Sequence, residues 1–322
     1  MTLRVGTDCS GLESPLLALR SLGVPFEHVF SSEIDKRCVK LIKDNFSPRI
    51  LFGDPDGPFP EGDITKRDLR DVPDIDVYIC GFPCQPFSKC GKRGGFDDPR
   101  GNVFFACVQL IRRKKPRYFV LENVPGILSH ARGETWAVIE EHLAALEREC
   151  GYKVEWRLLN SRLHAGVPQN RPRVFILGTL AGDIRWPEQC EMAPLRNYIN
   201  WDNKKSRPMP PSLERIWPQI EGCGLWLLNV NAFPAHLAAN GKLRTMQAGR
   251  PGFWAPCVCA TQRYWCLPLS RFLTGAEVLG LQGIEAHRLR GLTDYHARFR
   301  AGNAMTVPLL ARIFRGLGIG LA

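Results

Sequence analysis

One cysteine in this chain of 322 residues stands in a setting that suits a nucleophile. An apolar stretch at 75–80 leads into Gly81-Phe-Pro-Cys-Gln-Pro-Phe-Ser88, in which prolines stand on either side of Cys84. Proline fixes its own φ angle, removes a backbone donor and pushes the preceding residue toward extended conformations. We therefore expect the Cys84 thiol on a stiff loop at the carboxyl end of a strand, where open α/β sheets bind ligands. Such a loop can hold a sulfur aimed at its substrate, and a buried structural cysteine is the alternative.

The composition is that of a basic, globular, intracellular protein. A hydrophobic fraction of 44% suits one large domain or two smaller ones. The twelve cysteines are dispersed, and Cys257-Val-Cys259 lacks the companions of a zinc site, so we expect reduced thiols and no metal. The amino terminus lacks the apolar core of a signal peptide, and no apolar run is long enough to span a membrane. The formal charge of +11 favours a polyanionic partner, nucleic acid first.

Strand and helix patterns alternate along the first 185 residues. The patterns predict strands at 3–8, 26–33, 74–80, 118–122, 154–159 and 174–180, and helices at 13–22, 35–45, 103–111 and 136–146. This alternation implies a largely parallel sheet covered on both faces. Periodicity fades at 186–269, which holds ten prolines and six of the eight tryptophans and is interpreted as a small irregular domain. Most of these tryptophans are expected in its core, and helical patterns return at 274–281 and 306–317.

The first strand and the turn after it have the form of a nucleotide-binding motif. Asp8 ends the strand, the small residues Cys9-Ser10-Gly11 make a tight turn, and Glu13 begins a helix. Glu33 ends the second strand 25 residues after Asp8, where an acid commonly accepts hydrogen bonds from a ribose. Asp63-Ile64 follows a loop rich in Pro and Gly, in a position suited to contact with an adenine. Together these residues predict a cofactor that contains adenosine, and an ordinary turn with solvated acids is the alternative.

Nine short motifs are spread along the chain in a definite order. They are Asp8-Cys-Ser-Gly-Leu-Glu13, Glu33-Ile-Asp35, Asp63-Ile64, Pro83-Cys-Gln85, Arg100-Gly-Asn-Val-Phe104, Glu122-Asn-Val124, Gln169-Asn-Arg-Pro-Arg173, Arg271-Phe-Leu-Thr274 and Gly302-Asn-Ala304. In this order they resemble the cytosine-C5 DNA methyltransferase family over most of the chain. The resemblance implies an α/β, Rossmann-like fold that uses S-adenosylmethionine, built from residues 1–185 and 270–322. Residues 186–269 would form the target-recognition domain.

The resemblance implies transfer of a methyl group from S-adenosyl-L-methionine to C5 of a cytosine in duplex DNA. Cytosine C5 is a poor nucleophile, and a thiolate added at C6 makes it reactive, so the resemblance assigns this attack to Cys84. Arg171 and Arg173 would lower the pKa of the thiol. Glu122, when protonated, would donate a hydrogen bond near N3 of the ring. The cytosine must leave the duplex stack before the sulfur can reach it.

The resemblance also distributes the binding residues. Those expected to contact the cofactor are Asp8, Ser10, Gly11, Leu12, Glu13, Glu33, Ile34, Asp63, Ile64, Pro83, Val103, Asn303 and Ala304. Those expected to contact DNA, on a basic loop able to close as a lid, are Gln85, Ser88, Lys89, Lys92 and Arg93. Two departures from the family pattern concern the cofactor. Ala304 stands where serine is usual, and the first turn is one residue shorter and lacks the aromatic residue that would stack on adenine.

Three other functions remain compatible with the sequence. A tRNA cytosine-C5 methyltransferase would share the fold, but its typical Cys-Phe-Thr tripeptide does not occur in the insert. A relative without enzymatic activity fits the altered first turn, while the intact Cys84, Glu122, Arg171 and Arg173 oppose it. A nicotinamide-dependent oxidoreductase would need Gly-x-Gly-x-x-Gly at that turn. We expect a monomer acting on double-stranded DNA with no membrane association, in the nucleus if eukaryotic and in the cytoplasm or nucleoid if prokaryotic or viral.

Overall fold

The computed structural model describes residues 2–83, 102–214, 218, 227–230 and 254–320. Packing divides the chain into two compact units. Unit 1 comprises Met1–Leu159, Pro172–Glu188 and Leu309–Ala322, and unit 2 comprises Asn160–Arg171 and Gln189–Pro308. The expected boundary after residue 185 lies close to the end of a unit 1 segment. Residues 270–308, expected in the catalytic domain, belong to unit 2 by packing, and α9 (Gly275–Gly280) and α10 (Asp294–Asn303) contact each other there.

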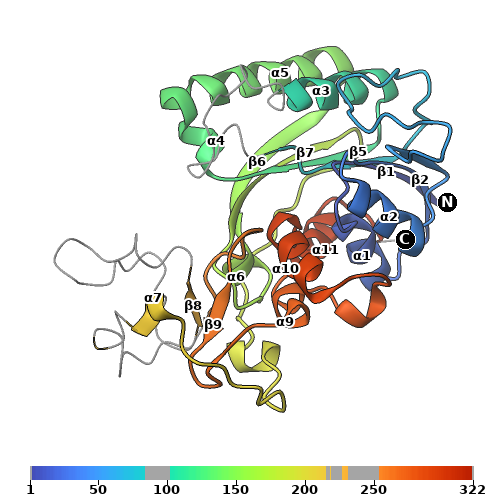
Figure 1. Ribbon diagram of the computed structural model, residues 1–322. Coiled ribbons are helices and arrows are strands. Elements are labelled where there is room, and N and C mark those ends of the chain that lie inside the picture. The colour runs from blue at the N-terminus through green and yellow to red at the C-terminus, as the bar shows by residue number, and fades with distance from the viewer. Residues whose placement is uncertain (1, 84–101, 215–217, 219–226, 231–253, 321–322) are drawn as a thin grey trace. The chain divides into compact units, whose positions relative to one another are not determined.

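Unit 1 is built on a seven-stranded sheet in the order β3-β2-β1-β4-β5-β7-β6 (Figure 1). The strands are β1 (Leu3–Asp8), β2 (Phe26–Ser32), β3 (Ile50–Phe52), β4 (Val77–Cys80), β5 (Tyr118–Asn123), β6 (Lys153–Asn160) and β7 (Pro172–Thr179). Strands β1 to β5 pair in parallel, and β7 is antiparallel to β5. The order reverses between β1 and β4, which is where open α/β sheets bind their ligands. The predicted, largely parallel sheet is confirmed.

Helices cover both faces of this sheet (Figure 1). One face carries α1 (Ser14–Ser21), α2 (Lys36–Asn45) and α11 (Val307–Gly316), and the other carries α3 (Val103–Lys114), α4 (Gly126–Ser129) and α5 (Glu134–Cys150). Strand β4 reads Val-Tyr-Ile-Cys and is buried throughout, as expected for a parallel strand covered on both sides. Its residues Tyr78 and Cys80 join Phe104 of α3 and Ile139 of α5 in one apolar core.

Unit 2 is smaller and less regular. Its sheet of β8 (Leu227–Asn229), β9 (Tyr264–Cys266) and β10 (Arg271–Phe272) is antiparallel, and α6 (Ser161–His164) and α7 (Pro211–Glu214) are single turns. Trp265 is 1% exposed and packs with Leu213 and Leu228, which confirms a core role for this tryptophan. Helix α9 begins with a capping box in which Thr274 and Glu277 satisfy each other's backbone donors. The pattern at 274–281 predicted this helix, whereas α10, which is mostly polar, was not predicted.

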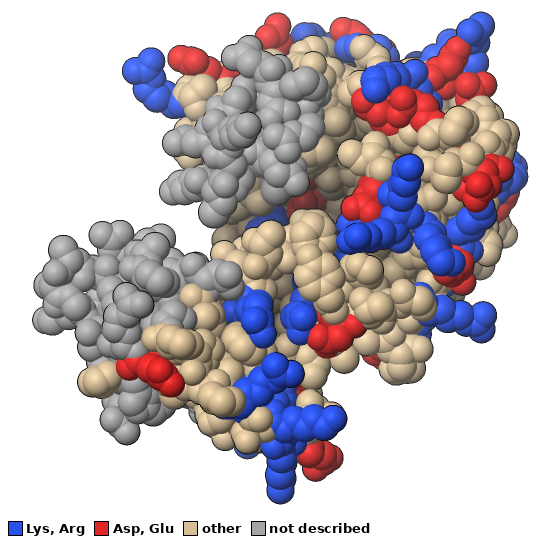
Figure 2. All heavy atoms as spheres, viewed as in Figure 1, with Lys and Arg blue, Asp and Glu red and all other residues tan. Residues whose placement is uncertain are grey.

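The surface of the protein reflects its composition. Figure 2 shows Lys and Arg side chains exposed at several places on the visible face, in keeping with the formal charge of +11. Among the helices of the described residues, none is long and apolar enough to cross a bilayer.

Candidate active site

The ends of four strands bring most of the predicted site residues of unit 1 to one edge of the sheet. Strands β1, β2, β4 and β5 end at Asp8, Ser32, Cys80 and Asn123. Because these strands are parallel, their carboxyl ends meet at the same edge. Strand β7 is antiparallel to β5, so its first residues, which include Arg173, also lie there. The edge therefore collects acids, a cation and the segment that leads to Cys84.

The turn between β1 and α1 has left-handed backbone at three positions. Cys9, Gly11 and Glu13 have φ angles of 51°, 55° and 54°. The Ser10 N–H donates to the Ser32 carbonyl at 3.2 Å, and the Gly11 N–H donates to Glu33 Oε2 at 2.9 Å. Left-handed backbone is costly for residues other than glycine, so the surrounding bonds must hold this turn in shape.

Glu33 joins the first turn to the start of α2. Its Oε1 accepts from the N–H groups of Ile34 and Asp35, each at 2.9 Å, and its Oε2 accepts from Gly11. Burial raises the pKa of Glu33, and these backbone donors oppose the shift. A carboxylate offers about four acceptor positions, so roughly one is left for a ligand. The neighbouring Ile34 is 70% exposed, which places an open apolar surface beside the acid.

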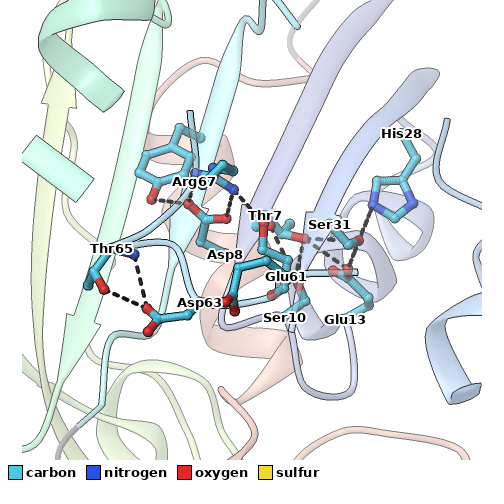
Figure 3. Close-up of polar contacts among 12 residues, drawn as sticks. Thr7, Asp8, Ser10, Glu13, His28, Ser31, Glu61, Asp63, Thr65 and Arg67 are labelled. Carbon is cyan, nitrogen blue, oxygen red and sulfur yellow. Dashed lines mark hydrogen bonds and ion pairs between the residues drawn. The ribbon is translucent and has the colours of Figure 1, made fainter. Parts of the chain in front are cut away.

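Asp8 is buried, and protein groups donate to both of its carboxylate oxygens (Figure 3). Arg67 donates to its two oxygens at 2.7 and 2.8 Å, and the Tyr78 hydroxyl donates to Oδ2 at 2.7 Å. Burial alone would lower the pKa of Arg67, but the charge and hydrogen bonds of Asp8 outweigh it and raise that pKa. Asp8 thus ties β1 to β4 and to the Arg67 segment. Sequence reasoning missed Arg67, because nothing local distinguishes it among 43 Lys and Arg residues.

Glu13 is fully buried at the start of α1 in a polar cluster (Figure 3). Its Oε1 accepts from Thr7 Oγ1 at 2.8 Å and from Ser31 Oγ, and His28 Nε2 lies 3.6 Å away. Its Oε2 has no hydrogen-bond partner among the described residues. Burial raises the pKa of Glu13 to about 7 against the opposing hydrogen bonds, and burial lowers the pKa of His28 to about 4. The predicted cofactor residue Glu13 therefore has one oxygen committed to the protein.

Asp63 begins the segment after the Pro/Gly-rich loop (Figure 3). Its Oδ1 accepts from the N–H and Oγ1 of Thr65 at 3.0 and 2.7 Å, and Lys66 Nζ lies 3.3 Å from Oδ2. Burial would raise the pKa of Asp63, but Thr65 and Lys66 outweigh it and the pKa is lowered. The predicted residues Leu12, Ile64 and Val103 are buried, so a ligand would meet their backbone rather than their side chains.

Glu122 and Arg173, both predicted to be catalytic, form an ion pair. The distance from Arg173 Nε to Glu122 Oε1 is 3.0 Å, and each side chain is 12% exposed. The two residues come from β5 and β7, which pair antiparallel. In the neighbouring pair of strands Leu121 lies opposite Cys80, so Glu122 stands next to the point where the chain leaves β4.

Asn123 fixes the segment that leads to the predicted nucleophile. Its Nδ2 donates to the Phe82 carbonyl at 3.2 Å, and its Oδ1 accepts from the Val124 N–H at 2.8 Å. Asn123 is 2% exposed, and the half-buried Pro83 follows Phe82 directly. The Glu-Asn-Val motif included Asn123, but no role was predicted for it. Cys84, Gln85, Ser88, Lys89, Lys92 and Arg93 lie outside the described residues.

Arg171 lies in unit 2, where it is 2% exposed. Its guanidinium donates to the carbonyls of Val258, Gly302 and Ala304 at 2.7, 3.0 and 2.8 Å. These bonds tie Arg171 to the backbone of unit 2. The catalytic role expected from the sequence stays a prediction. Of the cofactor residues predicted in this unit, Asn303 is exposed at the end of α10 and Ala304 is buried.

Gly302 meets the chain closely at the same place. A Cβ added there would lie 2.0 Å from the Ala260 nitrogen, so a side chain does not fit. The neighbouring Gln169 also binds backbone, with Nε2 donating to the Leu281 carbonyl at 2.6 Å and Oε1 accepting from the Val258 N–H at 2.9 Å. The Gln-Asn-Arg part of the motif thus joins three segments of unit 2.

Fold and edge together define a class of protein. Unit 1 is an open α/β domain with a nucleotide-type turn, an acid after its second strand, and a partly buried ion pair at the carboxyl edge of the sheet. Such an edge is suited to bind an adenosine-containing ligand and to stabilise charge on a reacting group next to it.

Comparison with known proteins identifies the family. The profile of the C-5 cytosine-specific DNA methylases matches residues 9–210. Type II methyltransferase M.NgoBI of Neisseria gonorrhoeae is 32% identical over 305 residues, which cover 88% of this chain and 83% of that protein. M.NgoBV of the same organism is 42% identical over 170 residues, or 51% of this chain and 37% of that protein. The chain belongs to the C-5 cytosine-specific DNA methylase family, as its motifs predicted.

The extent of these similarities differs. The alignments with M.NgoBV and two further curated type II methyltransferases span 35–37% of the lengths of those proteins, little more than a third. The solved structure of S. pombe Dnmt2 methyltransferase shares 16% identity with a TM-score of 0.62, and the match covers 98% of both chains. At that identity the likeness supports the fold alone, and it confirms the predicted Rossmann-like methyltransferase architecture.

Proposed function

We propose that this chain is a DNA (cytosine-5)-methyltransferase that methylates C5 of a cytosine flipped out of duplex DNA. The methyl donor would be S-adenosyl-L-methionine, and the reaction would pass through a bond between the Cys84 sulfur and C6. The observation that carries this proposal is the Glu122–Arg173 ion pair of 3.0 Å, which stands beside the strand end that leads to Cys84. We also propose that the protein acts inside the cell as a monomer on its DNA.

The turn and strand ends of unit 1 fit an adenosine-containing cofactor. The carboxylate of Glu33 retains roughly one acceptor position for a ribose hydroxyl. Ile34 offers an exposed apolar surface to a flat ring, which partly replaces the aromatic residue missing from the first turn. The methyl donor, when bound, supplies an electrophilic methyl group on a sulfonium. We propose Gly11, Glu33, Ile34 and Asp63 as direct contacts.

Other predicted cofactor residues are proposed to act indirectly. Asp8 holds the strand ends through Arg67, and Ser10 and Glu13 hold the turn through buried hydrogen bonds. Leu12, Ile64, Pro83 and Val103 shape the edge from within, and Asn303 and Ala304 remain proposed contacts from the resemblance alone.

The chain's own residues divide the proposed chemistry among them. Addition of the Cys84 thiolate at C6 places negative charge on the ring, and a protonated Glu122 would meet that charge by donating to N3. Since an ion pair with Arg173 favours the carboxylate form of Glu122, protonation requires the entering base to weaken the pair. The Arg173 guanidinium would then be available to stabilise the thiolate. Once C5 carries the methyl group, a base removes the C5 proton. The electron pair of that C–H bond forms the C5–C6 double bond and expels the Cys84 thiolate, which restores the aromatic ring.

The primary experiment measures methyl transfer to duplex DNA from S-adenosylmethionine carrying a labelled methyl group. We expect wild type and Cys150→Ala to be active and Cys84→Ala to be inactive although folded. Cys150 is a suitable control because it is the last residue of α5 and belongs to none of the nine motifs. Transfer tRNA serves as the competing substrate. Equal activity of Cys84→Ala and wild type, or methylation of tRNA alone, would contradict the proposal.

A second experiment tests the covalent step. In DNA containing 5-fluorocytosine, fluorine replaces the proton that must leave C5, so the protein should remain bonded to the base. We expect a denaturation-resistant protein–DNA band with wild type and none with Cys84→Ala. Steady turnover on ordinary DNA without any trapped band would exclude the covalent route.

A further inference from the structure

A polar pocket lies at the edge of the unit 1 sheet opposite the candidate active site. It has a volume of about 490 Å³, and Arg4, Asp76, Lys114 and Arg117 are among its lining residues. Arg4 stands near the start of β1, and Asp76 and Arg117 directly precede β4 and β5. These are the amino ends of the strands. Since β1 has six residues, its length of roughly 20 Å separates the two edges.

The charges around this pocket do not balance. Arg4 and Asp76 neutralise each other, with Nη2 to Oδ1 at 2.9 Å, Nε to Oδ2 at 3.1 Å and the Arg4 N–H to Oδ2 at 2.8 Å. Lys114 Nζ is 3.9 Å from the exposed Asp74, a weak pairing. Lys115 and Arg117 complete the charged lining, and neither forms an ion pair within the described part of the chain. The pocket is therefore lined by four cations and two acids, and one of the acids, Asp76, is already paired with Arg4.

The helix dipole accounts for only part of this arrangement. Cations in the last turn of a helix offset its negative end, which explains Lys114 at the end of α3. Arg4 and Arg117 belong to strand beginnings rather than to the helix, so the dipole does not explain their convergence. Arg117 instead lies over the Tyr118 ring at 5.2 Å. Excess positive charge from Lys114, Lys115 and Arg117, next to the Arg4–Asp76 pair, is the arrangement expected of a surface that binds phosphate groups.

The pocket continues into an exposed basic run. Residues 112–117 read Arg-Arg-Lys-Lys-Pro-Arg, and Arg113 and Lys115 are exposed. Arg112 is paired with Glu149 at 2.9 Å, so the remaining cations carry the excess charge. A pocket that opens onto such a run suits a polymer with regularly spaced phosphates better than a small phosphate compound that a closed site would enclose.

We propose that this pocket and the run 112–117 form a second DNA-contact surface, which binds the backbone phosphates of a duplex segment other than the one at the active edge. Because phosphate contacts carry no sequence information, the surface would bind any duplex. It would keep the enzyme attached to neighbouring DNA while a target cytosine is exchanged. The inference rests on the charges of unit 1 and goes beyond the proposed methyl transfer.

The test counts duplexes bound by the full-length protein at low salt. Titration calorimetry with an A·T duplex of about one helical turn should show two duplexes per protein for wild type and one for Lys115→Ala/Arg117→Ala. The control Lys40→Ala/Arg315→Ala removes the same charge from exposed positions of α2 and α11 and should still bind two. In wild type, binding of the second duplex should weaken with salt, with a slope of log affinity against log salt of about −0.9 for each phosphate contacted. Circular dichroism checks that each variant is folded.

Several outcomes would overturn the inference. They are binding of only one duplex by wild type, binding of two duplexes by the Lys115/Arg117 variant, or loss of one duplex by the Lys40/Arg315 control as well. Inorganic pyrophosphate is titrated separately. Suppose that pyrophosphate raises the unfolding midpoint of wild type but not of the Lys115/Arg117 variant, and that both proteins bind the same number of duplexes. The site then takes small phosphate compounds instead. Methyl transfer at saturating DNA should be the same in all three proteins. No methyl transfer by wild type would contradict the proposed catalytic function but would not affect the proposed second DNA-contact surface.

Discussion

The Asp8 carboxylate and the Arg67 guanidinium meet through hydrogen bonds of 2.7 and 2.8 Å, and both side chains are at most 3% exposed. The two residues are 59 positions apart in the chain. Arg67 also lies over the rings of Phe30 and Phe52, at 5.2 and 4.9 Å from their centroids. A single buried cation therefore supports the strand ends on which the proposed cofactor turn rests.

Removal of Arg67 should destabilise unit 1 strongly. Arg67→Leu leaves the Asp8 charge buried without its partner, which typically costs about 3–5 kcal/mol of unfolding free energy. Urea unfolding monitored by fluorescence measures the loss. The control Arg70→Leu breaks an exposed pair with Asp68 and should leave the urea midpoint near that of wild type. Similar midpoints for the two variants would show that the buried pair does not support the fold.

Glu13 should make folding stability depend on pH. Its pKa is raised from 4.5 to about 7 in the folded state, so the folded protein binds this proton more tightly than the unfolded chain does. The contribution is present in full below about pH 4.5 and is lost as the pH rises through about 7. Glu13→Gln imitates the protonated form at every pH. Between pH 4.5 and pH 8 the variant should gain on the order of 3 kcal/mol relative to wild type.

Because His28 also titrates, the effect of Glu13 has to be measured as the difference between wild type and Glu13→Gln. Its pKa falls from 6.5 to about 4 in the folded state, so its contribution has the opposite sign and is lost as the pH falls from about 6.5. In wild type the two slopes largely cancel between about pH 4.5 and 6.5. Urea unfolding of wild type and Glu13→Gln across this range separates the contribution of Glu13 from that of His28. A constant difference between Glu13→Gln and wild type at all pH values would rule out a titrating Glu13.

Asn123→Ala should lower turnover much more than cofactor binding. The variant frees the Phe82 carbonyl two residues before Cys84, and a displacement of about 1 Å in a catalytic group can cost about 100-fold in rate. We expect kcat for methyl transfer to fall by that order while KM for S-adenosylmethionine changes little. Asn45→Ala removes a comparable side-chain bond, to the Leu41 carbonyl at 2.8 Å, and should keep kcat. A rise in KM with unchanged kcat would contradict the positioning role.

The two arginines of the Gln-x-Arg-x-Arg motif should respond differently to lysine. Arg171→Lys cannot reach all three carbonyls, so it should lower the stability of unit 2 by about 3 kcal/mol. Arg173→Lys should leave urea unfolding nearly unchanged and lower kcat by about 10- to 100-fold, because the geometry of its pairing with Glu122 is lost. Urea titrations and initial rates on the same preparations decide this. A stable but inactive Arg171→Lys would support the catalytic role predicted for Arg171 from the sequence.

Local patterns in the sequence determined the architecture of unit 1 and the family. Strand and helix periodicities reflect which faces are buried, so the parallel sheet and most of its strands and covering helices could be predicted, with bounds within about four residues of those observed. The short elements β3 and α4 were not predicted. The motifs at strand ends, such as Glu33 and Glu122-Asn-Val124, could be placed at one edge because parallel strands share a direction.

Only the tertiary structure decided which distant groups satisfy one another. Three such contacts join Arg67 to Asp8, the Phe82 carbonyl to Asn123, and several carbonyls to Arg171, between residues 41 to 133 positions apart. A chain pattern does not specify which of many cations or carbonyls will lie next to a buried charge, since that depends on how loops close over the completed sheet. For the same reason Arg171 could not be separated from Arg173, two residues away, until the chain had placed one in each unit.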